Sequence, residues 1–259
     1  MKEIRIWFFY TINSFQQTLS NRFITGVFIF AKSLRIGLFL VFLHFIFQGT
    51  TDLAGFSRNQ IIFFYLSFNL IDTLSQLLFR QVYHFRSYLI TGNLDFVLTK
   101  PVHPLLKLLL GGADVLDLIM CIVLVIITVW FGVAYITTDW IAWLGFLALV
   151  VNGLLISAGF HISVLAFSVV TITVDHLIMI YRDLTSLLRI PIDVYIEPLR
   201  SILTFIIPLG IMITFPAKLL MGLLSWQMLT LSIILSITYF SLSIVAWNWS
   251  LRHYQSASS

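Results

Sequence analysis

The sequence predicts an all-α polytopic membrane protein, and three observations support this fold class. Hydrophobic residues make up 59% of the chain, charged residues make up only 10%, and the mean hydropathy is +1.00. This composition is typical of integral membrane proteins. Several apolar runs also approach the ~20 residues that a helix needs to cross a ~30 Å hydrocarbon core. We expect six transmembrane helices in a single transmembrane domain, residues 1–259.

The first expected element is an amphipathic helix over residues 3–20. Its apolar face carries Ile4, Phe8 and Phe15, and Asn13 lies on the polar face. A helix that is polar on one side lies in the membrane interface and does not cross the bilayer. We expect no cleavable signal peptide, because this segment lacks a compact apolar core before a small-residue cleavage site.

Five later apolar runs are long enough to be spans. They lie at 23–47, 60–79, 115–136, 143–170 and 226–249, and a loop over 80–114 separates the second from the third. In the third span, twelve large aliphatic or Phe side chains follow Asp117. Each of these side chains contributes roughly −0.5 kcal/mol to the free energy of insertion. Together they outweigh the roughly +3 kcal/mol that an Asp costs at a helix centre.

The assignment of residues 171–222 is open from hydropathy. Hydropathy alone places a fifth span at 202–222 and leaves 171–200 as a charged cytoplasmic loop. Three prolines, Pro198, Pro208 and Pro216, argue against a straight helix, because each removes a backbone donor and disturbs the preceding turn. Irregular backbone at membrane depth survives only when it is buried in protein or lines a cavity.

Lys and Arg are concentrated in alternate loops, which predicts the orientation. The basic residues on the first side are Lys2, Arg5, Arg22, Lys32, Arg35, Arg80, Arg86, Lys100 and Lys107. The opposite loops hold Arg58 and Lys218 at most. Positive residues favour the cytoplasmic side, so we expect the N-terminus there, and an even number of spans puts Arg252 there too.

The loop over 80–114 begins as an amphipathic helix. Phe85 and Leu89 lie on its apolar face, and a Gly92-Asn93 pair ends the helix. A cytoplasmic segment that is half apolar docks onto a partner or lies on the bilayer surface, and the residue pattern leaves both open.

Several short motifs together resemble one family. The motifs are Gly92–Pro101 (GNLDFVLTKP), Arg189–Tyr195 (RIPIDVY) before Pro198, Ile207–Leu209 (IPL), Phe215–Ala217 (FPA) and Gly222. In order and spacing they resemble permease subunits of type-2 ATP-binding-cassette exporters, in a bacterial branch of six-span permeases of about this length.

The resemblance implies a non-catalytic transmembrane subunit in the bacterial inner (cytoplasmic) membrane. A second copy or a sister permease would complete the translocation pathway, and separate ATPase subunits would bind ATP and Mg, so this chain would bind no cofactor. The first cytoplasmic loop would couple to the ATPases. The coupling residues expected from the resemblance are Phe85, Arg86, Leu89, Gly92, Leu94, Asp95, Lys100 and Pro101.

The resemblance also favours a different fifth span, at 173–190. The segment up to residue 222 would then be re-entrant on the outer side, and its prolines would form an external gate. These are Pro191, Pro198, Pro208 and Pro216. This interpretation buries Arg182, Asp183 and Arg189, which would need partners.

Two polar stripes are candidates for the pathway. Asn69, Asp72 and Gln76 lie at i, i+3 and i+7 of the second span, and Asp175, Arg182 and Arg189 recur every seven residues. Each stripe can line a cavity or form structural pairs with neighbouring helices.

Other charged residues near the spans have structural interpretations. We expect Lys32 and Arg35 to extend to the inner interface, as long basic side chains do near membranes. We expect Asp114 and Asp117 to cap the third span, because carboxylates stabilise helix N-termini.

Enzymatic functions lack support in the sequence. No phosphate-binding G-x-x-x-x-G-K-[ST] loop and no H-E-x-x-H pair is present, and Cys121 is the only cysteine, so we expect no metal site. An ion-coupled carrier or channel that uses Asp72 or the 175–189 stripe remains the alternative to an ATP-driven exporter. The transported compound is not specified by these residues.

Overall fold

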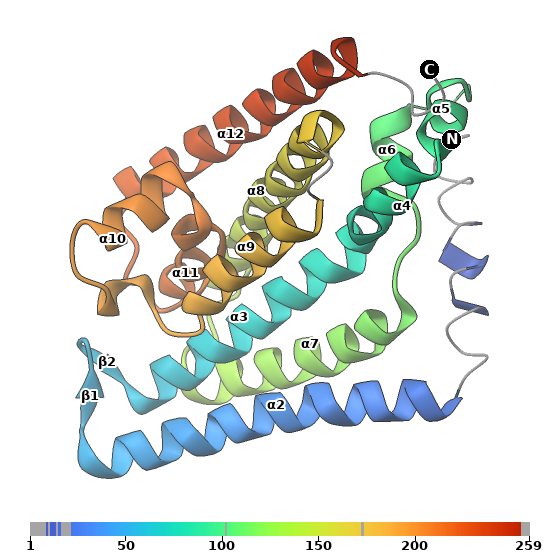
Figure 1. The fold of residues 1–259 in the computed structure, drawn as a ribbon. Helices are drawn as coiled ribbons and strands as arrows, with labels where there is room; N and C mark the ends of the chain where they lie inside the picture. Colours follow the sequence, from blue (N-terminus) through green and yellow to red (C-terminus); the bar gives the residue numbers. More distant parts are fainter. Residues whose placement is uncertain are drawn as a thin grey trace.

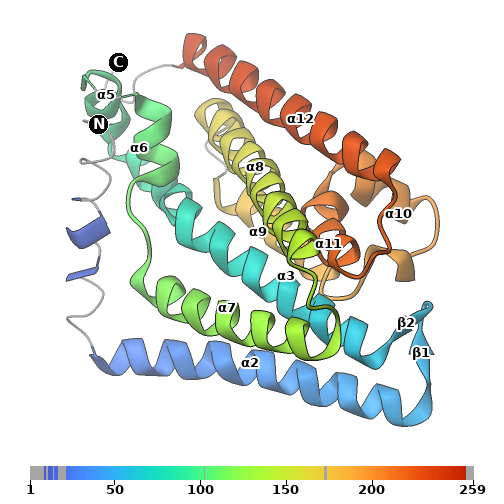
Figure 2. The same ribbon diagram turned by 180° about the vertical axis from the view of Figure 1, so that it is seen from behind.

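The computed structural model describes residues 9, 11–13, 15–16, 22–101, 103–171 and 174–254. Long helices run roughly side by side, with α2 and α12 at opposite edges of the bundle in both views (Figures 1 and 2). The β1–β2 hairpin and α10 lie at one end of the bundle, which we call the hairpin end. Helices α4, α5 and α6 lie at the other, which we call the α4–α6 end.

In the described part of the chain, the regular structure is helical apart from one short hairpin. Its elements are α2 (Arg22–Gly49), β1 (Asp52–Leu53), β2 (Phe56–Ser57), α3 (Arg58–Phe79), η1 (Arg80–His84), α4 (Phe85–Ile90), α5 (Asn93–Leu98), α6 (Pro104–Leu110), α7 (Val115–Tyr135), α8 (Trp140–Thr171), α9 (Val174–Leu187), η2 (Ile192–Val194), α10 (Leu199–Ser201), η3 (Ile202–Ile206), α11 (Leu209–Leu220) and α12 (Trp226–Arg252). The hairpin pairs Asp52 with Ser57 and Leu53 with Phe56.

Five of the described helices are long and apolar enough to cross a membrane. They are Phe23–Gly49, Arg58–Ile90, Val115–Tyr135, Trp140–Thr171 and Trp226–Arg252. A bent pair of shorter helices brings the number of candidates to six. The predicted fold class, an all-α polytopic membrane protein, is therefore confirmed. These helices overlap the predicted spans, but Arg58–Ile90 extends beyond residue 79 into the predicted cytoplasmic loop over 80–114, and α8 begins at Trp140 rather than at residue 143.

The predicted amphipathic helix over residues 3–20 falls largely outside the described residues. Within the part that is described, Thr11 is buried and its hydroxyl accepts a hydrogen bond from the Ala113 amide at 3.4 Å. This contact places residue 11 next to the chain segment that leads into α7.

Helix α3 is the centre of the bundle and is buried along most of its length. It packs against α7, α8 and α11, and its buried aromatic residues include Phe63, Phe64 and Tyr65. In contrast, α2, α7 and α12 expose many large apolar side chains. That distribution fits a bundle in which α3 is surrounded by protein and the outer helices face lipid.

The segment after α9 turns sharply within the bundle. The helices Leu199–Ile206 and Leu209–Leu220 meet at an angle of 91° around Pro208, so the alternative of one straight span over 202–222 is wrong. Pro191, Pro198 and Pro208 precede η2, α10 and α11, where a proline lacks only a donor that would be unpaired anyway. Helix α11 nevertheless continues through Pro216, contrary to the expectation that each proline would disturb it.

Helix α9 covers only part of the expected fifth span at 173–190. It ends at Leu187. Its 14 residues extend about 21 Å, which is less than the ~30 Å hydrocarbon core. Helix α11, which is buried almost throughout, fills the bundle next to α8. This burial satisfies the requirement that a broken helix at membrane depth be enclosed by protein.

Small residues allow the closest helix contacts. A Cβ atom on Gly153 of α8 would lie 2.6 Å from the Met212 carbonyl oxygen of α11. Along α12, four serines are buried on the side that faces α8, and each hydroxyl donates to a carbonyl three or four residues earlier in its own helix. They are Ser232, Ser236, Ser243 and Ser250.

Gly153→Ala is expected to destabilise the folded chain, because the backbone of α11 must move to admit the methyl group. Overpacking of this kind costs about 1–3 kcal/mol. Unfolding in mixed detergent micelles measures the loss. The matched control is Gly26→Ala in α2, where a Cβ meets nothing within 4 Å. Equal stability of the two variants would contradict the close α8–α11 contact.

Candidate functional site

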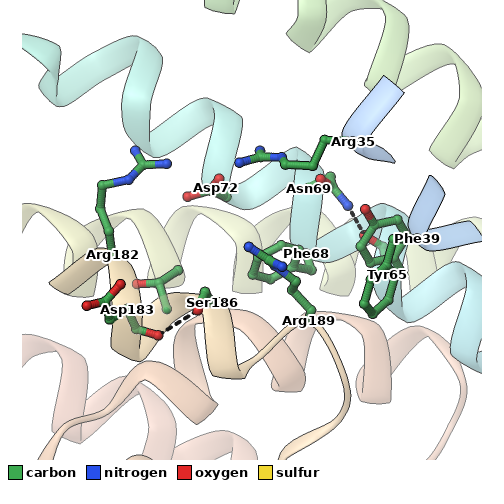
Figure 3. A pocket seen from close by; sticks show the side chains of 11 residues that line it. Arg35, Phe39, Tyr65, Phe68, Asn69, Asp72, Arg182, Asp183, Ser186 and Arg189 are labelled. Atoms are coloured by element: carbon green, nitrogen blue, oxygen red, sulfur yellow. Dashed lines mark hydrogen bonds between the residues drawn. The ribbon is translucent and has the colours of Figure 1, made fainter. Parts of the chain in front are cut away.

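A polar cavity of 180 Å³ lies between α2, α3 and α9 (Figure 3). Its lining combines charged and aromatic side chains. The lining residues are Arg35, Phe39, Tyr65, Phe68, Asn69, Asp72, Arg182, Asp183, Thr185, Ser186 and Arg189. A water-accessible volume between transmembrane helices is a common place for a ligand or translocation pathway.

Four of the six predicted pathway residues meet at this cavity. They are Asn69 and Asp72 of α3, Arg182 of α9 and Arg189 of the turn that follows α9. Gln76 lies one helical turn further along α3 and donates a hydrogen bond of 2.7 Å to Asp72 Oδ2. Asn69 and Asp72 of the α3 stripe therefore line the cavity, and Gln76 holds the Asp72 carboxylate by a hydrogen bond.

Asp175 lies elsewhere, so the predicted seven-residue stripe does not form one surface. Its carboxylate accepts a hydrogen bond of 2.6 Å from the Arg86 guanidinium of α4, and both side chains are about half exposed. Because α9 ends at Leu187, Arg189 also does not extend the helix face. A seven-residue spacing would place Asp175, Arg182 and Arg189 on one face of a longer helix, but α9 ends two residues before Arg189.

Positive charge exceeds negative charge in the cavity. Three guanidinium groups, from Arg35, Arg182 and Arg189, share it with the carboxylates of Asp72 and Asp183. Among the residues that the structure describes, no carboxylate lies within 4 Å of these three guanidinium groups. In Figure 3, Arg182 and Arg35 lie on either side of Asp72.

Aromatic rings form another wall of the cavity. The rings of Phe39 and Tyr65 are stacked with centroids 4.4 Å apart, and Phe68 stacks on Tyr65 at 6.3 Å. The Asn69 amide donates to the Tyr65 carbonyl at 2.8 Å and is thereby fixed at the rim of this wall. The cavity thus offers cationic donors and an apolar surface to the same ligand.

A second cavity, of 510 Å³, adjoins the first on the side of the α4–α6 end. The two share Arg35 and Arg182. The other lining residues are Phe28, Ala31, Lys32, Gln76, Arg80, Tyr83 and His84. The Arg182 guanidinium donates to the Tyr83 hydroxyl at 3.4 Å, so Arg182 stands between the two spaces.

Lys32 and Asp117 form a buried ion pair with a separation of 2.5 Å, and their side chains are 7% and 0% exposed. The predicted extension of Lys32 to the interface is therefore wrong. Asp114 does cap α7, because its carboxylate accepts from the Leu116 amide at 2.8 Å. Asp117 instead pairs with Lys32 and lies 3.6 Å from Arg80.

Hydrogen bonds attach α9 to the centre of the bundle. The Tyr181 hydroxyl lies 3.3 Å from Ser75 Oγ of α3 and 3.1 Å from Ser157 Oγ of α8, and the two serine hydroxyls bond each other. The His161 ring packs against Tyr181 with centroids 4.8 Å apart. This polar cluster fixes the position of Arg182, the next residue along α9.

The coupling segment is bound to its own chain more closely than the sequence suggested. Phe85 is fully buried and Leu89 is nearly so, in a cluster that includes Val174 and Ile178 of α9 and Trp247 of α12. Phe85 and Leu89, two of the expected coupling residues, are therefore covered by their own chain and do not offer a free surface to a partner. Their amphipathic pattern correctly indicated burial, but the surface that covers them is intramolecular.

Other residues of the segment do reach the surface. Gly92 adopts φ +70°, a left-handed conformation that favours glycine, and so starts α5 after a sharp turn. Leu94 is fully buried, whereas Lys100 and Pro101 are exposed. Burial and the neighbouring Lys100 charge lower the pKa of Lys107 on the adjacent α6.

Two apolar side chains of the segment are exposed on the surface of the chain at the α4–α6 end. Ile90 is 59% exposed and Phe96 is 68% exposed. Asp95 lies between Leu94 and Phe96 on α5, and Arg86 lies on α4. The amphipathic pattern identified only the buried face of α4, so the sequence analysis missed Ile90 at the end of α4 and Phe96 on α5.

At the hairpin end, one carboxylate holds the proline-containing segment together. Asp193 accepts hydrogen bonds from Lys218 of α11 at 2.8 Å and from Arg200 of α10 at 3.0 Å. Arg200 was not among the basic residues expected in the outer loops, but it lies at the hairpin end and its charge is paired with Asp193. A gating role for the four prolines remains a prediction.

These observations define the class of protein. A bundle of apolar helices that encloses a charged cavity is the arrangement of a membrane transport protein. Residues 34–258 match the family described as "ABC-2 family transporter protein", and the chain belongs to this family. The predicted resemblance to a permease subunit of a type-2 ABC transporter is thereby confirmed. A comparison with curated proteins gives no match, and neither does a comparison with solved structures.

Proposed function

We propose that the chain is the permease subunit of an ATP-driven exporter of amphipathic or hydrophobic compounds. Family membership supports a permease within an ABC transporter. The observation that supports a transport pathway through this chain is the charged cavity between α2, α3 and α9. Charged cavities occur in ATP-driven exporters and in ion-coupled carriers, so the cavity alone does not separate the two classes. Membership of the ABC-2 family is what favours the ATP-driven exporter.

A second permease, identical or related, completes the pathway in this proposal. Asp183 of α9 borders the cavity but is exposed in the single chain, and so are Met179 and Ile180 beside it. A carboxylate near the centre of a bilayer costs at least ~3 kcal/mol when it faces lipid. A partner permease or a water-filled pathway on this face of α9 removes that cost.

The charge distribution supports an orientation in an inner membrane. Basic residues at the α4–α6 end include Arg80, Arg86, Lys100, Lys107 and Arg252. At the hairpin end, Arg200 and Lys218 both pair with Asp193, which leaves Arg58. Positive residues favour the cytoplasm, so the α4–α6 end would be cytoplasmic, and we expect both termini of the chain on the same side of the membrane.

The coupling route in this proposal runs from α4 and α5 to α9. ATPase subunits, which carry ATP and Mg, dock on the exposed surface around Ile90 and Phe96. Helix α4 contacts α9, Phe85 and Ile178 belong to one buried cluster, and the Arg86–Asp175 ion pair also joins the two helices. A shift of α4 therefore moves Arg182 relative to Asp72.

Purification of the chain in a mild detergent with its accompanying subunits tests the function. The complex, reconstituted in proteoliposomes, is expected to hydrolyse ATP. The hydrolysis should disappear when the phosphate-loop lysine of the ATPase subunit is replaced by alanine, with the permease still present. Recovery of the chain in a functional state without any ATPase, and with transport that an ionophore abolishes, would contradict the proposal and favour the ion-coupled carrier.

A further inference from the structure

The charge of the cavity distinguishes between classes of cargo. Three guanidinium groups line it, and Asp72 is the carboxylate that lies between two of them. Asp72 also accepts the Gln76 amide, and Asp183 lies on the exposed side of α9. Cationic side chains within a membrane protein require a counter-charge, and here the protein supplies less than one carboxylate for each guanidinium.

The three arginines come from separate elements. Arg35 belongs to α2, Arg182 to α9 and Arg189 to the turn after α9. Figure 3 shows all three around the same space. The one hydrogen bond that the described structure gives any of their guanidinium groups is the long contact from Arg182 to Tyr83. Their remaining donors are available to a ligand.

The shape of the two cavities suggests how a ligand would lie. The wall of Phe39, Tyr65 and Phe68 is aromatic, and the second cavity extends to η1, on the side of the α4–α6 end. Arg35 and Arg182 border both spaces. A molecule with one charged group and an apolar remainder could therefore contact the guanidinium groups and the aromatic wall together.

We propose that this cavity binds the anionic group, a phosphate or a carboxylate, of an amphipathic molecule that enters from the side of the α4–α6 end. Guanidinium groups bind these anions with two parallel hydrogen bonds, a geometry that an ammonium group does not provide. The inference rests on the proposed function and specifies its substrate class. The same three arginines outnumber the two carboxylates of the lining and so disfavour cationic amphiphiles.

Binding is tested with the full-length chain in nanodiscs of phosphatidylcholine. The probe is radiolabelled dodecyl phosphate, and the competitors are inorganic phosphate, phosphatidylglycerol and dodecyltrimethylammonium. The expected result is saturable binding that the cationic competitor leaves intact. Competition by inorganic phosphate at low millimolar concentration assigns the site to a free anion, and competition by phosphatidylglycerol alone assigns it to a lipid headgroup. Displacement by dodecyltrimethylammonium as strongly as by unlabelled dodecyl phosphate overturns the inference.

Two variants with opposite expected effects separate binding from folding. Arg182→Gln should weaken dodecyl phosphate binding by about tenfold or more, since a charge-assisted bidentate contact is lost. Asp72→Asn should strengthen binding several-fold, because it removes the competing carboxylate, and a folding defect would not produce a gain. The control is Arg58→Gln at the hairpin end, which should bind as the parent does. Unchanged binding in both cavity variants would contradict the assignment of the site.

The failure of this inference can be distinguished from the failure of the proposed function. Binding of dodecyl phosphate is measured without nucleotide and without transport. ATP hydrolysis by the reconstituted complex is measured without any anionic amphiphile. A complex that hydrolyses ATP but does not bind the probe remains a permease with a different substrate class.

Discussion

Lys32→Met is expected to destabilise the folded chain by about 3–5 kcal/mol, because it leaves the buried Asp117 carboxylate without its close partner. The ammonium group is 2.5 Å from Asp117 Oδ1, and the carboxylate is completely buried. Arg80, at 3.6 Å, compensates only in part. The loss is measured as a shift of the unfolding transition when a denaturing detergent is added to micelles.

A double variant provides the control for this prediction. Lys32→Met combined with Asp117→Leu removes both charges and should recover most of the lost stability, since replacing a buried pair by apolar residues is often neutral. Lys100→Met, at an exposed cation, should leave the transition unchanged. If the single and double variants were equally unstable, the ion pair would not be what joins α2 to α7.

The second large effect is expected at the surface of the coupling segment. Ile90→Asp with Phe96→Asp should abolish co-purification of the ATPase subunits while the permease stays folded. Apolar anchors of an interface commonly contribute about 2 kcal/mol or more each, and a carboxylate adds a desolvation cost. Co-purification is measured after equal amounts of permease are captured, and the unfolding transition is measured in parallel.

Two comparisons make this result interpretable. Ile196→Asp at the hairpin end replaces a side chain that is 82% exposed and should leave ATPase binding intact. Phe85→Ala, in contrast to the Ile90/Phe96 variant, should destabilise the folded permease by about 3–5 kcal/mol, because it leaves a cavity in the core. Normal ATPase binding by the Ile90/Phe96 variant would refute docking at this surface.

Features that depend on local sequence were predictable. A run of apolar residues is sufficient to locate a helix such as α7, because the length of the hydrocarbon core is fixed. The spacing of Asn69 and Asp72 was sufficient to place both on one face of α3, and that face lines the cavity. The prolines argued against a straight helix over 202–222, and a 91° bend is present around Pro208.

Features that depend on contacts between distant residues were not predictable. Lys32 and Asp117 are 85 positions apart in the sequence, and nothing in either local pattern identifies the other as a partner. The amphipathic pattern around Phe85 showed which face would be buried but not whether a partner or the same chain would cover it. The position of Arg189 depended on where α9 ends, and helix ends are set by packing as well as by local signals.

The buried serines of α12 bear on how the chain is assembled during synthesis. Each hydroxyl is bonded to a carbonyl of its own helix, as with Ser236 and Ser232, so α12 carries no unsatisfied hydroxyl on this face. The helix can therefore leave the translocon and enter lipid without waiting for a polar partner. Its small side chains then allow close approach to α8 by van der Waals packing alone. We therefore expect insertion of α12 and its docking on α8 to be separable events in the biogenesis of this permease.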